Sequence, residues 1–242
     1  MRRIEDITEA IRQYDPEANI DIISKAYVFS AKVHRGQTRL SGEPYMSHPL
    51  EVAYILTQLH MDAISVAVGL LHDTVEDTFA TPEEIKKSFG EEIMLLVDSV
   101  TKISKIHFAS HEEQQAENYR KMILAMSKDL RVILIKLADR THNVRTLGFM
   151  PEDKQKVIAR ETLDIYAPLA NRLGIGWLKQ NLEDYSFRYL YPKEYKFIEE
   201  SVAKGAEERQ KIIDLTTQIV EKKLSSSGIP VKVMGRSKHY YS

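Results

Sequence analysis

An apolar run from Ala63 to Leu71 leads directly into a segment that carries one imidazole and three carboxylates. If one helix continues through this run to Asp77, His72 and Glu76 are i,i+4 neighbours on it, as are Asp73 and Asp77. All four side chains then gather at one end of a buried helix. Three carboxylates this close repel one another unless a cation lies among them. The segment therefore predicts chemistry rather than core packing.

A second polar line follows the apolar stretch from Val132 to Leu137. Asp139, Asn143 and Thr146 fall at i, i+4 and i+7, so they share one face of a helix, with His142 beside them. Polar side chains that follow buried turns need partners, and a metal ion supplies such partners.

A histidine also stands before Pro49, a proline that can take the first position of the next helix. This histidine completes a candidate metal site of imidazole and carboxylate ligands: His48, His72, Asp73 and Asp139. Such ligands suit manganese, iron or zinc, whereas magnesium prefers surroundings made only of oxygen. The residues alone do not choose among the first three metals.

Each of these pieces also has a purely structural interpretation. A histidine before a proline is usually a turn or capping residue, and the pair Asp139-Arg140 on a helix is usually a surface ion pair. Acidic residues at a helix end are usually solvated, and short motifs often match by chance. The three segments together favour the metal site.

The composition sets the class of protein. The 242 residues suffice for one large domain, or for one domain and the beginning of another. The chain is 43% hydrophobic and 29% charged, as in ordinary soluble globular proteins, and its formal net charge of -1 gives no reason to expect direct nucleic acid binding. It has no cysteine, which excludes disulfides and thiolate metal sites.

The longest apolar run is too short to span a bilayer and the start lacks the apolar core of a signal peptide, so we expect a cytoplasmic protein.

Helical patterns cover most of the chain, and they predict an all-α fold. Thr81-Pro82-Glu83-Glu84 combines an N-cap, a proline at the first helical position and a capping-box glutamate, and Gly90 can end that helix. Further helices are predicted over Ile93 to Val100, Tyr119 to Met126, Pro151 to about Tyr166, Trp177 to Tyr189 and Lys193 to Leu224.

The character of the sequence changes after the turn-like segment Ser225 to Gly228. Residues Ile229 to Arg236 alternate as a strand does. A strand that occurs once in a helical chain has no partner. We therefore expect the first strand of a second domain that is cut off here.

The polar segments, taken with their surroundings, resemble a known family. His48, the pair His72-Asp73 and Asp139 match the HD superfamily of metal-dependent phosphohydrolases in order and residue type. The longer pattern is similar to the hydrolase domain of the RelA/SpoT homologues, the bacterial enzymes that make and degrade guanosine tetra- and pentaphosphate. The segments that carry this similarity are His34 to Gln37, Ser41 to Pro49, His72 to Thr78, Val100 to Ile103 and Lys136 to Leu147.

The resemblance implies a domain division. It predicts a helical HD-type hydrolase domain over residues 1–190, helical linkers over 191–228 and the truncated start of a synthetase domain over 229–242. The last eight residues, Gly235 to Ser242, resemble the opening motif of that synthetase domain. The partners then missing from this chain are the rest of the synthetase domain and the regulatory domains, and no membrane partner is expected.

The resemblance also implies the chemistry. His48, His72, Asp73 and Asp139 would hold Mn²⁺, and the reaction is hydrolysis of the 3′-diphosphate of guanosine 3′,5′-bis(diphosphate), or of the pentaphosphate, to GDP or GTP and pyrophosphate. The cation would lower the pKa of an attacking water molecule. The catalytic residues implied are Glu76 and Asp77, which match the acidic couple that orients and deprotonates this water. The sequence does not divide the two roles, and Asp77 could instead be a helix-end residue that supports His72.

The nucleotide-binding residues implied are Arg39, Ser41, Tyr45, Ser47, Asn143 and Thr146. Arg39 would stack its guanidinium plane on the guanine base. Lys136, Arg140 and Arg145 add positive charge, but they lie on different helical faces and cannot all reach the site. The chain has Leu40 where some members of the family carry a basic residue, and Thr141 where leucine is common.

Three other functions compete with this interpretation. The chain could hydrolyse a different nucleotide, such as a deoxynucleoside triphosphate, or it could be a regulatory module that binds the alarmone without turnover. An RNA-binding helical domain is disfavoured by the balanced charge and by the lack of an aromatic and basic platform. Intact His-Asp and Glu-Asp elements favour an active hydrolase.

Overall fold

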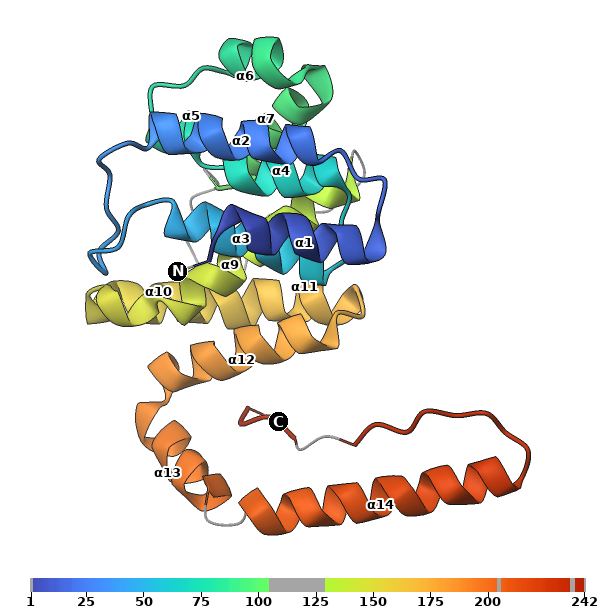
Figure 1. Ribbon diagram of the computed structural model, residues 1–242. Coiled ribbons are helices and arrows are strands. Elements are labelled where there is room, and N and C mark those ends of the chain that lie inside the picture. Colours follow the sequence, from blue (N-terminus) through green and yellow to red (C-terminus); the bar gives the residue numbers. More distant parts are fainter. Residues whose placement is uncertain (1, 105–128, 204–205, 236–237, 242) are drawn as a thin grey trace.

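The computed structural model describes residues 2–104, 129–203, 206–235 and 238–241, and this part of the chain forms helices without strands (Figure 1). The first helices are α1 (Ile4–Tyr14), α2 (Ile20–Val33), α3 (Ser47–Gln58), α4 (Ala63–Leu71), α5 (Thr74–Asp77), α6 (Pro82–Phe89) and α7 (Glu91–Ser104). They are followed by α9 (Leu130–Arg145), the 3-10 turn η1 (Leu147–Phe149), α10 (Glu152–Glu161), the π-helical turn η2 (Thr162–Tyr166), α11 (Ala167–Arg172), α12 (Gly176–Leu190), α13 (Pro192–Ala203) and α14 (Ala206–Ser226). The all-α prediction is confirmed for these residues.

The apolar run of the sequence forms α4, which is the central helix of the bundle. Every residue of α4 except Ile64 is buried, and the helix packs against α2, α3, α7 and α9. A helix that is apolar on all sides is stable only when it is surrounded in this way. The side chain of Asp62 starts the helix by accepting a hydrogen bond from the backbone N–H of Ser65 at 2.7 Å.

The prediction of one continuous helix from Ala63 to Asp77 is wrong, because α4 ends at Leu71 and α5 begins at Thr74. The hydroxyl of Thr74 donates to the carbonyl oxygen of Leu71 at 2.6 Å, and so takes the acceptor that the helix would offer to its next turn. Asp73 has φ −92° and ψ −7°, which lies outside the regular helical range. The break places His72 in the core and leaves Glu76 exposed.

The second polar line lies on α9, as predicted. This helix packs against α3, α4, α7 and α12, and its apolar face belongs to the same core as α4. Since α3, α4 and α9 contact one another, polar residues at matching levels of these three helices meet inside the bundle. The helix α3 begins at Ser47, so Pro49 is its third residue and not its first.

Other predicted helices agree with the structure in type and differ at their ends. The helix α6 has the predicted capping box, in which Thr81 and Glu84 each accept a hydrogen bond from the other's backbone N–H. The helix expected from Pro151 to Tyr166 is α10 followed by the wider turn η2. The helix expected over Lys193 to Leu224 is divided into α13 and α14. The helix predicted over Tyr119 to Met126 lies outside the described residues.

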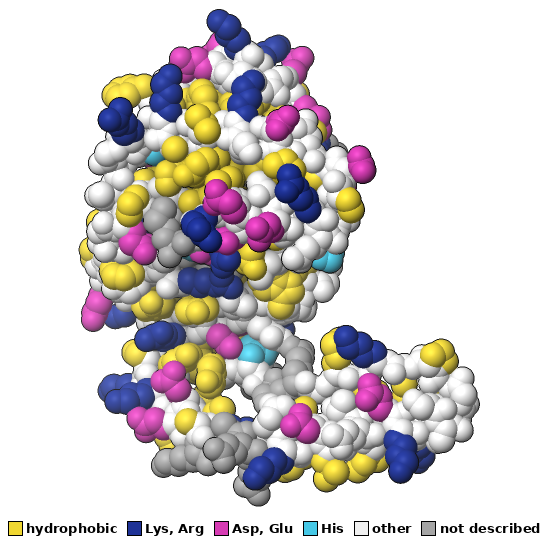
Figure 2. Space-filling model, in the orientation of Figure 1, with side chains coloured by type: hydrophobic (Ala, Val, Ile, Leu, Met, Phe, Trp, Pro, Cys, Tyr) yellow, Lys and Arg dark blue, Asp and Glu magenta, His cyan; other side chains and the backbone are white. Residues whose placement is uncertain are grey.

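The last helices extend away from the bundle. Figure 1 shows α13 and α14 below it, with the final residues running back along α14 toward α12. In the space-filling view this part forms a separate lower lobe with hydrophobic side chains on its surface (Figure 2), and Ile212, Leu215 and Ile219 of α14 are each more than half exposed. The strand predicted from Ile229 is not formed in the described part of the tail, in agreement with its lack of a partner strand. Within the described residues, no helix is both long and apolar enough to cross a membrane.

Candidate metal centre and nucleotide cavity

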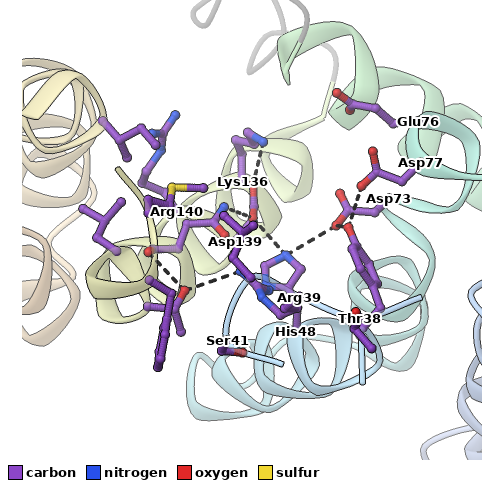
Figure 3. Close-up of a pocket in the computed structure, with 18 of the residues that line it drawn as sticks. Thr38, Arg39, Ser41, His48, Asp73, Glu76, Asp77, Lys136, Asp139 and Arg140 are labelled. Atoms are coloured by element: carbon purple, nitrogen blue, oxygen red, sulfur yellow. Dashed lines mark hydrogen bonds and ion pairs between the residues drawn. The ribbon is translucent and has the colours of Figure 1, made fainter. Parts of the chain in front are cut away.

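Four side chains from three separate parts of the chain meet at one point of the bundle. His48 lies in the first turn of α3, His72 and Asp73 lie at the break after α4, and Asp139 lies in the middle of α9. His48 Nε2 is 3.2 Å from Asp139 Oδ1 and 3.4 Å from Asp73 Oδ2. His72 Nε2 is 3.0 Å from Asp73 Oδ1 and 3.8 Å from Asp139 Oδ1. Figure 3 shows His48 between the two aspartates.

The protonation of His72 fits a metal ligand. Its Nδ1 donates a hydrogen bond to the carbonyl oxygen of Gly69 at 2.9 Å, so the proton of the neutral ring is on Nδ1. Its Nε2 is buried without a hydrogen-bond partner of good geometry, although it faces carboxylate oxygens. A lone pair that points at carboxylates in a buried place is unfavourable, so Nε2 either carries a proton or faces a cation that lies between it and the carboxylates. His48, His72 and Asp139, which are all buried, also have ligand atoms within 4.8 Å of one another.

The pKa values of His72, Asp73 and Asp139 depend on one another. Burial lowers the pKa of His72, but Asp73 and Asp139 more than offset this and raise it to about 9. Burial raises the pKa of Asp139, whereas Lys136 and the two histidines hold it well below its usual range. The pKa of Asp73 is lowered mainly by His72, against the effect of burial. The two carboxylates therefore stay ionised, and a divalent cation could take the place of the proton on His72.

Two side chains of its own helix hold Asp139 in place. Its Oδ2 lies 2.5 Å from the Nζ of Lys136, and its Oδ1 accepts a hydrogen bond from the side-chain amide of Asn143 at 2.6 Å. Lys136, Asp139 and Asn143 share one face of α9, which confirms the predicted spacing for Asp139 and Asn143. These contacts fix the carboxylate before any ion binds.

Tyr45 connects the metal cluster to the acidic pair. Its hydroxyl lies 2.7 Å from Asp73 Oδ2 and 2.5 Å from Asp77 Oδ2, and its ring stacks on His34 with 4.3 Å between ring centroids. Burial raises the pKa of Tyr45, and the two aspartates raise it further, so the phenol keeps its single proton. The hydroxyl predicted to contact the nucleotide is thus occupied by two carboxylates in this structure.

These groups line one cavity of about 540 Å³. Glu76, Asp77 and the cluster residues His48, Asp73 and Asp139 lie along its wall (Figure 3). A second part of the wall is apolar and is formed by Leu147, Phe149, Met150 and Ile158. The volume is in the range of sites that bind small molecules. The cavity therefore offers a metal centre, an acidic pair and an apolar surface to one ligand.

The predicted nucleotide-binding residues divide into two groups. Arg39, Ser41, Tyr45, Asn143 and Thr146 line the cavity. Arg39 Nη2 lies 3.4 Å from both Asn143 Oδ1 and Thr146 Oγ1, so it bridges the loop before α3 and the end of α9. Ser47 does not line the cavity. It is buried, and its hydroxyl lies 3.5 Å from Glu43 Oε2.

The cations of α9 are placed as the helical spacing predicts. Lys136 and Arg140 line the cavity, whereas Arg145 turns away and donates to the side-chain oxygen of Asn181 at 2.7 Å. Arg140 has two partners. Its Nη2 lies 3.1 Å from Glu161 Oε1, and its guanidinium carbon lies 4.3 Å from the centroid of the Tyr166 ring. Tyr166 lies in the π-helical turn η2, which directly follows Glu161.

Sequence reasoning missed several residues of the site. Glu161 and most of the apolar wall (Phe149, Met150 and Ile158) come from α10 and the segment before it, where the sequence gives no motif. His142 was placed beside the polar line of α9, but its contact with His48 was not predicted. Its Nδ1 lies 2.7 Å from the Nδ1 of His48. Burial is the largest cause that lowers the pKa of His142, to about 3, and the ring is neutral.

The comparisons with known proteins agree with this site. A family model described as an HD domain matches residues 26–176. A "GTP pyrophosphokinase" of Myxococcus xanthus is 57% identical over 235 residues, which cover 96% of this chain and 31% of that protein. The "Bifunctional (p)ppGpp synthase/hydrolase SpoT" of Escherichia coli (strain K12) is 47% identical over 242 residues, 100% of this chain and 34% of that protein.

A solved structure gives a further comparison. It is described as "A metazoan ortholog of SpoT hydrolyzes ppGpp and plays a role in starvation responses", and it is 30% identical with a TM-score of 0.50. The match covers 69% of this chain and 94% of that one. The chain spans about a third of the length of the curated relatives that it matches. By its HD domain and by its relatives along its whole length, this chain belongs to the HD-domain family and, within it, to the RelA/SpoT homologues.

Proposed function

We propose that this chain hydrolyses the 3′-diphosphate of guanosine 3′,5′-bis(diphosphate), and of the corresponding pentaphosphate, to GDP or GTP and pyrophosphate. The observation that carries the proposal is the convergence of His48, His72, Asp73 and Asp139 at the wall of a cavity that Glu76 and Asp77 also line, with His72 buried behind the wall. The names of the relatives support the same substrate, since one is a "(p)ppGpp synthase/hydrolase" and a structural neighbour "hydrolyzes ppGpp".

The proposed cofactor is Mn²⁺, held by the two imidazoles and the two aspartates. When bound, it would supply Lewis acidity and offset negative charge on the diphosphate. The mixed nitrogen and oxygen donors suit manganese better than magnesium. The buried Nε2 of His72, which faces carboxylates without a hydrogen-bond partner, and the two ionised aspartates support a cation at this place.

Glu76 and Asp77 are the proposed proton acceptors and donors. Both line the cavity one turn beyond Asp73. Asp77 is anchored by the hydroxyl of Tyr45, whereas Figure 3 shows Glu76 at the outer edge of the group. An anchored carboxylate keeps its geometry, so Asp77 suits the orientation of a water molecule, and Glu76, which is exposed, suits exchange of protons with solvent.

Arg39, Asn143 and Thr146 are the proposed nucleotide contacts. Arg39 lines the same cavity as the metal cluster and the apolar wall, so its guanidinium plane can cover one face of the guanine base. Ser41 lines the same part of the cavity, and Ser47 would act through Glu43, which its hydroxyl contacts. Lys136 and Arg140 also line the cavity, where their charges are paired with the carboxylates of Asp139 and Glu161.

The domain division remains part of the proposal. Residues 1–190 would form the hydrolase domain, 191–228 a helical linker and 229–242 the start of a synthetase domain. The extension of α13 and α14 away from the bundle supports this division (Figure 1). The proposed reaction would take place in the cytoplasm, where guanine nucleotides are found. The proposal includes no membrane partner and no direct nucleic acid binding by these residues.

The test is incubation with guanosine tetraphosphate, with and without Mn²⁺, followed by nucleotide chromatography. GDP and pyrophosphate formed only with the metal support the proposal. Asp73→Ala should abolish the reaction and metal retention together. Tight binding of the nucleotide without turnover in the presence of Mn²⁺ would instead indicate a regulatory module. Release of triphosphate from a deoxynucleoside triphosphate would indicate another substrate.

A further inference from the structure

We infer that His142 is a positioning residue, which holds His48 in the tautomer and ring orientation that a metal ligand needs. The inference rests on the metal centre of the proposed function, but not on the identity of the nucleotide. It assigns a role to a buried histidine that contacts no carboxylate of the cluster in the hydrogen bonds described above. His142 is 8% exposed and His48 is 2% exposed.

The geometry is that of a direct hydrogen bond between two imidazoles. His48 Nδ1 and His142 Nδ1 are 2.7 Å apart, and their ring centroids are 4.9 Å apart with 41° between the ring planes. Two nitrogens at this distance share one proton, so one ring donates and the other accepts. The rings come from different helices, α3 and α9, which pack against each other.

The position of the cluster decides which ring donates. His48 Nε2 faces Asp139 at 3.2 Å and Asp73 at 3.4 Å, so Nε2 is the atom that can ligate a cation. A ligating nitrogen carries a lone pair, and the proton of the neutral ring is then on Nδ1. His48 Nδ1 therefore donates to His142 Nδ1, and His142 carries its own proton on Nε2.

The two metal-binding histidines are thus oriented in different ways. His72 donates from Nδ1 to the backbone carbonyl oxygen of Gly69, a residue of its own helix. His48 donates to a side chain on another helix, and this side chain lies three residues after the ligand Asp139. Ligating histidines usually donate to a carboxylate, a backbone carbonyl or water, and such partners raise metal affinity. An imidazole acceptor orients the ligating histidine in the same way, and it adds no negative charge to a cluster that already has two aspartates.

The substitutions that test this role are His142→Leu and His142→Asn. Leucine fills space but accepts no hydrogen bond. Asparagine carries its side-chain oxygen on the same carbon that carries Nδ1 in histidine, so it can accept the proton of His48. We expect His142→Leu to weaken Mn²⁺ binding, measured by calorimetry, by about 10- to 100-fold. We expect His142→Asn to stay within about threefold of the parent, and the exposed His60→Asn to have no effect.

Equal Mn²⁺ affinity in the parent and His142→Leu would overturn the inference, as would an equal loss in both variants at position 142. A parent that binds no divalent metal would overturn the proposed function and this inference together, whereas a metal-binding parent without alarmone hydrolysis would overturn only the substrate.

A measurement on the parent protein covers the case in which His142→Leu does not fold. Nitrogen-15 spectra of the histidine side chains report the tautomer of each ring, in the metal-free protein and in a protein loaded with the diamagnetic ion Zn²⁺. The expected result is a proton on Nε2 of His142 and on Nδ1 of His48 in both states. A proton on Nδ1 of His142 would show that this ring donates, and would overturn the assignment.

Discussion

His72 donates a hydrogen bond from Nδ1 to the carbonyl oxygen of Gly69, three residues earlier, at 2.9 Å. Gly69 also allows α4 to pack close to α3, because it has no side chain. A Cβ atom at this position would lie 2.6 Å from Leu56 Cδ1 and 3.4 Å from the Cα of Ala53. One glycine therefore sets the packing of two core helices and the direction of a proposed metal ligand.

We expect Gly69→Ala to lower the free energy of unfolding by about 1–3 kcal/mol, because the added methyl group has to displace Leu56 or shift α4. The shift would also move the carbonyl that aims His72, so Mn²⁺ affinity should fall. Urea denaturation and calorimetry measure the two effects. Gly176→Ala is the control, since a Cβ atom there meets no atom within 4 Å. Equal stability of the two variants would contradict the packing argument.

The sequence points to side chains that meet at the proposed metal centre where the signal is local. His72 and Asp73 end an apolar run, and Asp139 shares a helical face with Asn143. The capping box of Thr81 and Glu84 was predicted for the same reason, since it depends only on a spacing of three residues. These features depend on residues that are close together in the chain, so they can be predicted from the sequence.

The parts that the sequence does not predict depend on how helices cross. The contact between His48 and His142 exists because α3 packs on α9, and the pairing of Arg140 with Glu161 exists because η2, which follows Glu161, packs against α9. The break after α4 depends on a competition between the hydroxyl of Thr74 and the helical hydrogen bond, and propensity alone does not decide it.

Glu76→Gln is expected to keep Mn²⁺ affinity and to lower kcat by about 10²- to 10⁴-fold, the usual contribution of a positioned acid or base. The reason is that Glu76 lines the cavity but lies beyond the four proposed ligands. Turnover of guanosine tetraphosphate and calorimetry with Mn²⁺ measure the two effects. Glu83→Gln, an exposed glutamate in the first turn of α6, should change neither. A normal rate in Glu76→Gln would remove this residue from the mechanism.

Arg39→Ala is expected to act on substrate binding. The guanidinium contacts Asn143 and Thr146 rather than the metal cluster, and its stacking on a base contributes about 0.5–2 kcal/mol, which corresponds to an increase in KM of about 2- to 30-fold. Arg39→Lys should not restore the parent KM, because an ammonium group lacks the flat surface. Steady-state kinetics test this, with the exposed Arg35→Ala as control. An unchanged KM in Arg39→Ala would exclude stacking.

Asp129 is expected to stabilise α9, the helix that carries Asp139, in a pH-dependent way. Its carboxylate caps the helix by accepting from the backbone N–H of Arg131 at 2.9 Å, and it pairs with the Arg131 side chain at 2.7 Å. Hydrogen bonds from the Arg131 side chain are the main cause that lowers the pKa of Asp129 in the folded protein. A carboxylate with a lowered pKa stabilises the fold above its unfolded pKa of about 3.9, and this contribution is lost as the pH falls through the folded pKa.

Asp129→Ala should therefore unfold more easily than the parent by about 1 kcal/mol at pH 7, the usual cost of a lost N-cap. The difference should shrink as the pH falls below about 4, because the parent then loses the same charge. Asp129→Asn is the matched variant, since its amide oxygen still caps the helix but carries no charge. It should retain most of the stability at pH 7 and show a weaker dependence on pH. Urea denaturation across this pH range measures both, and a difference between Asp129→Ala and the parent that stays constant with pH would contradict the role of the ion pair.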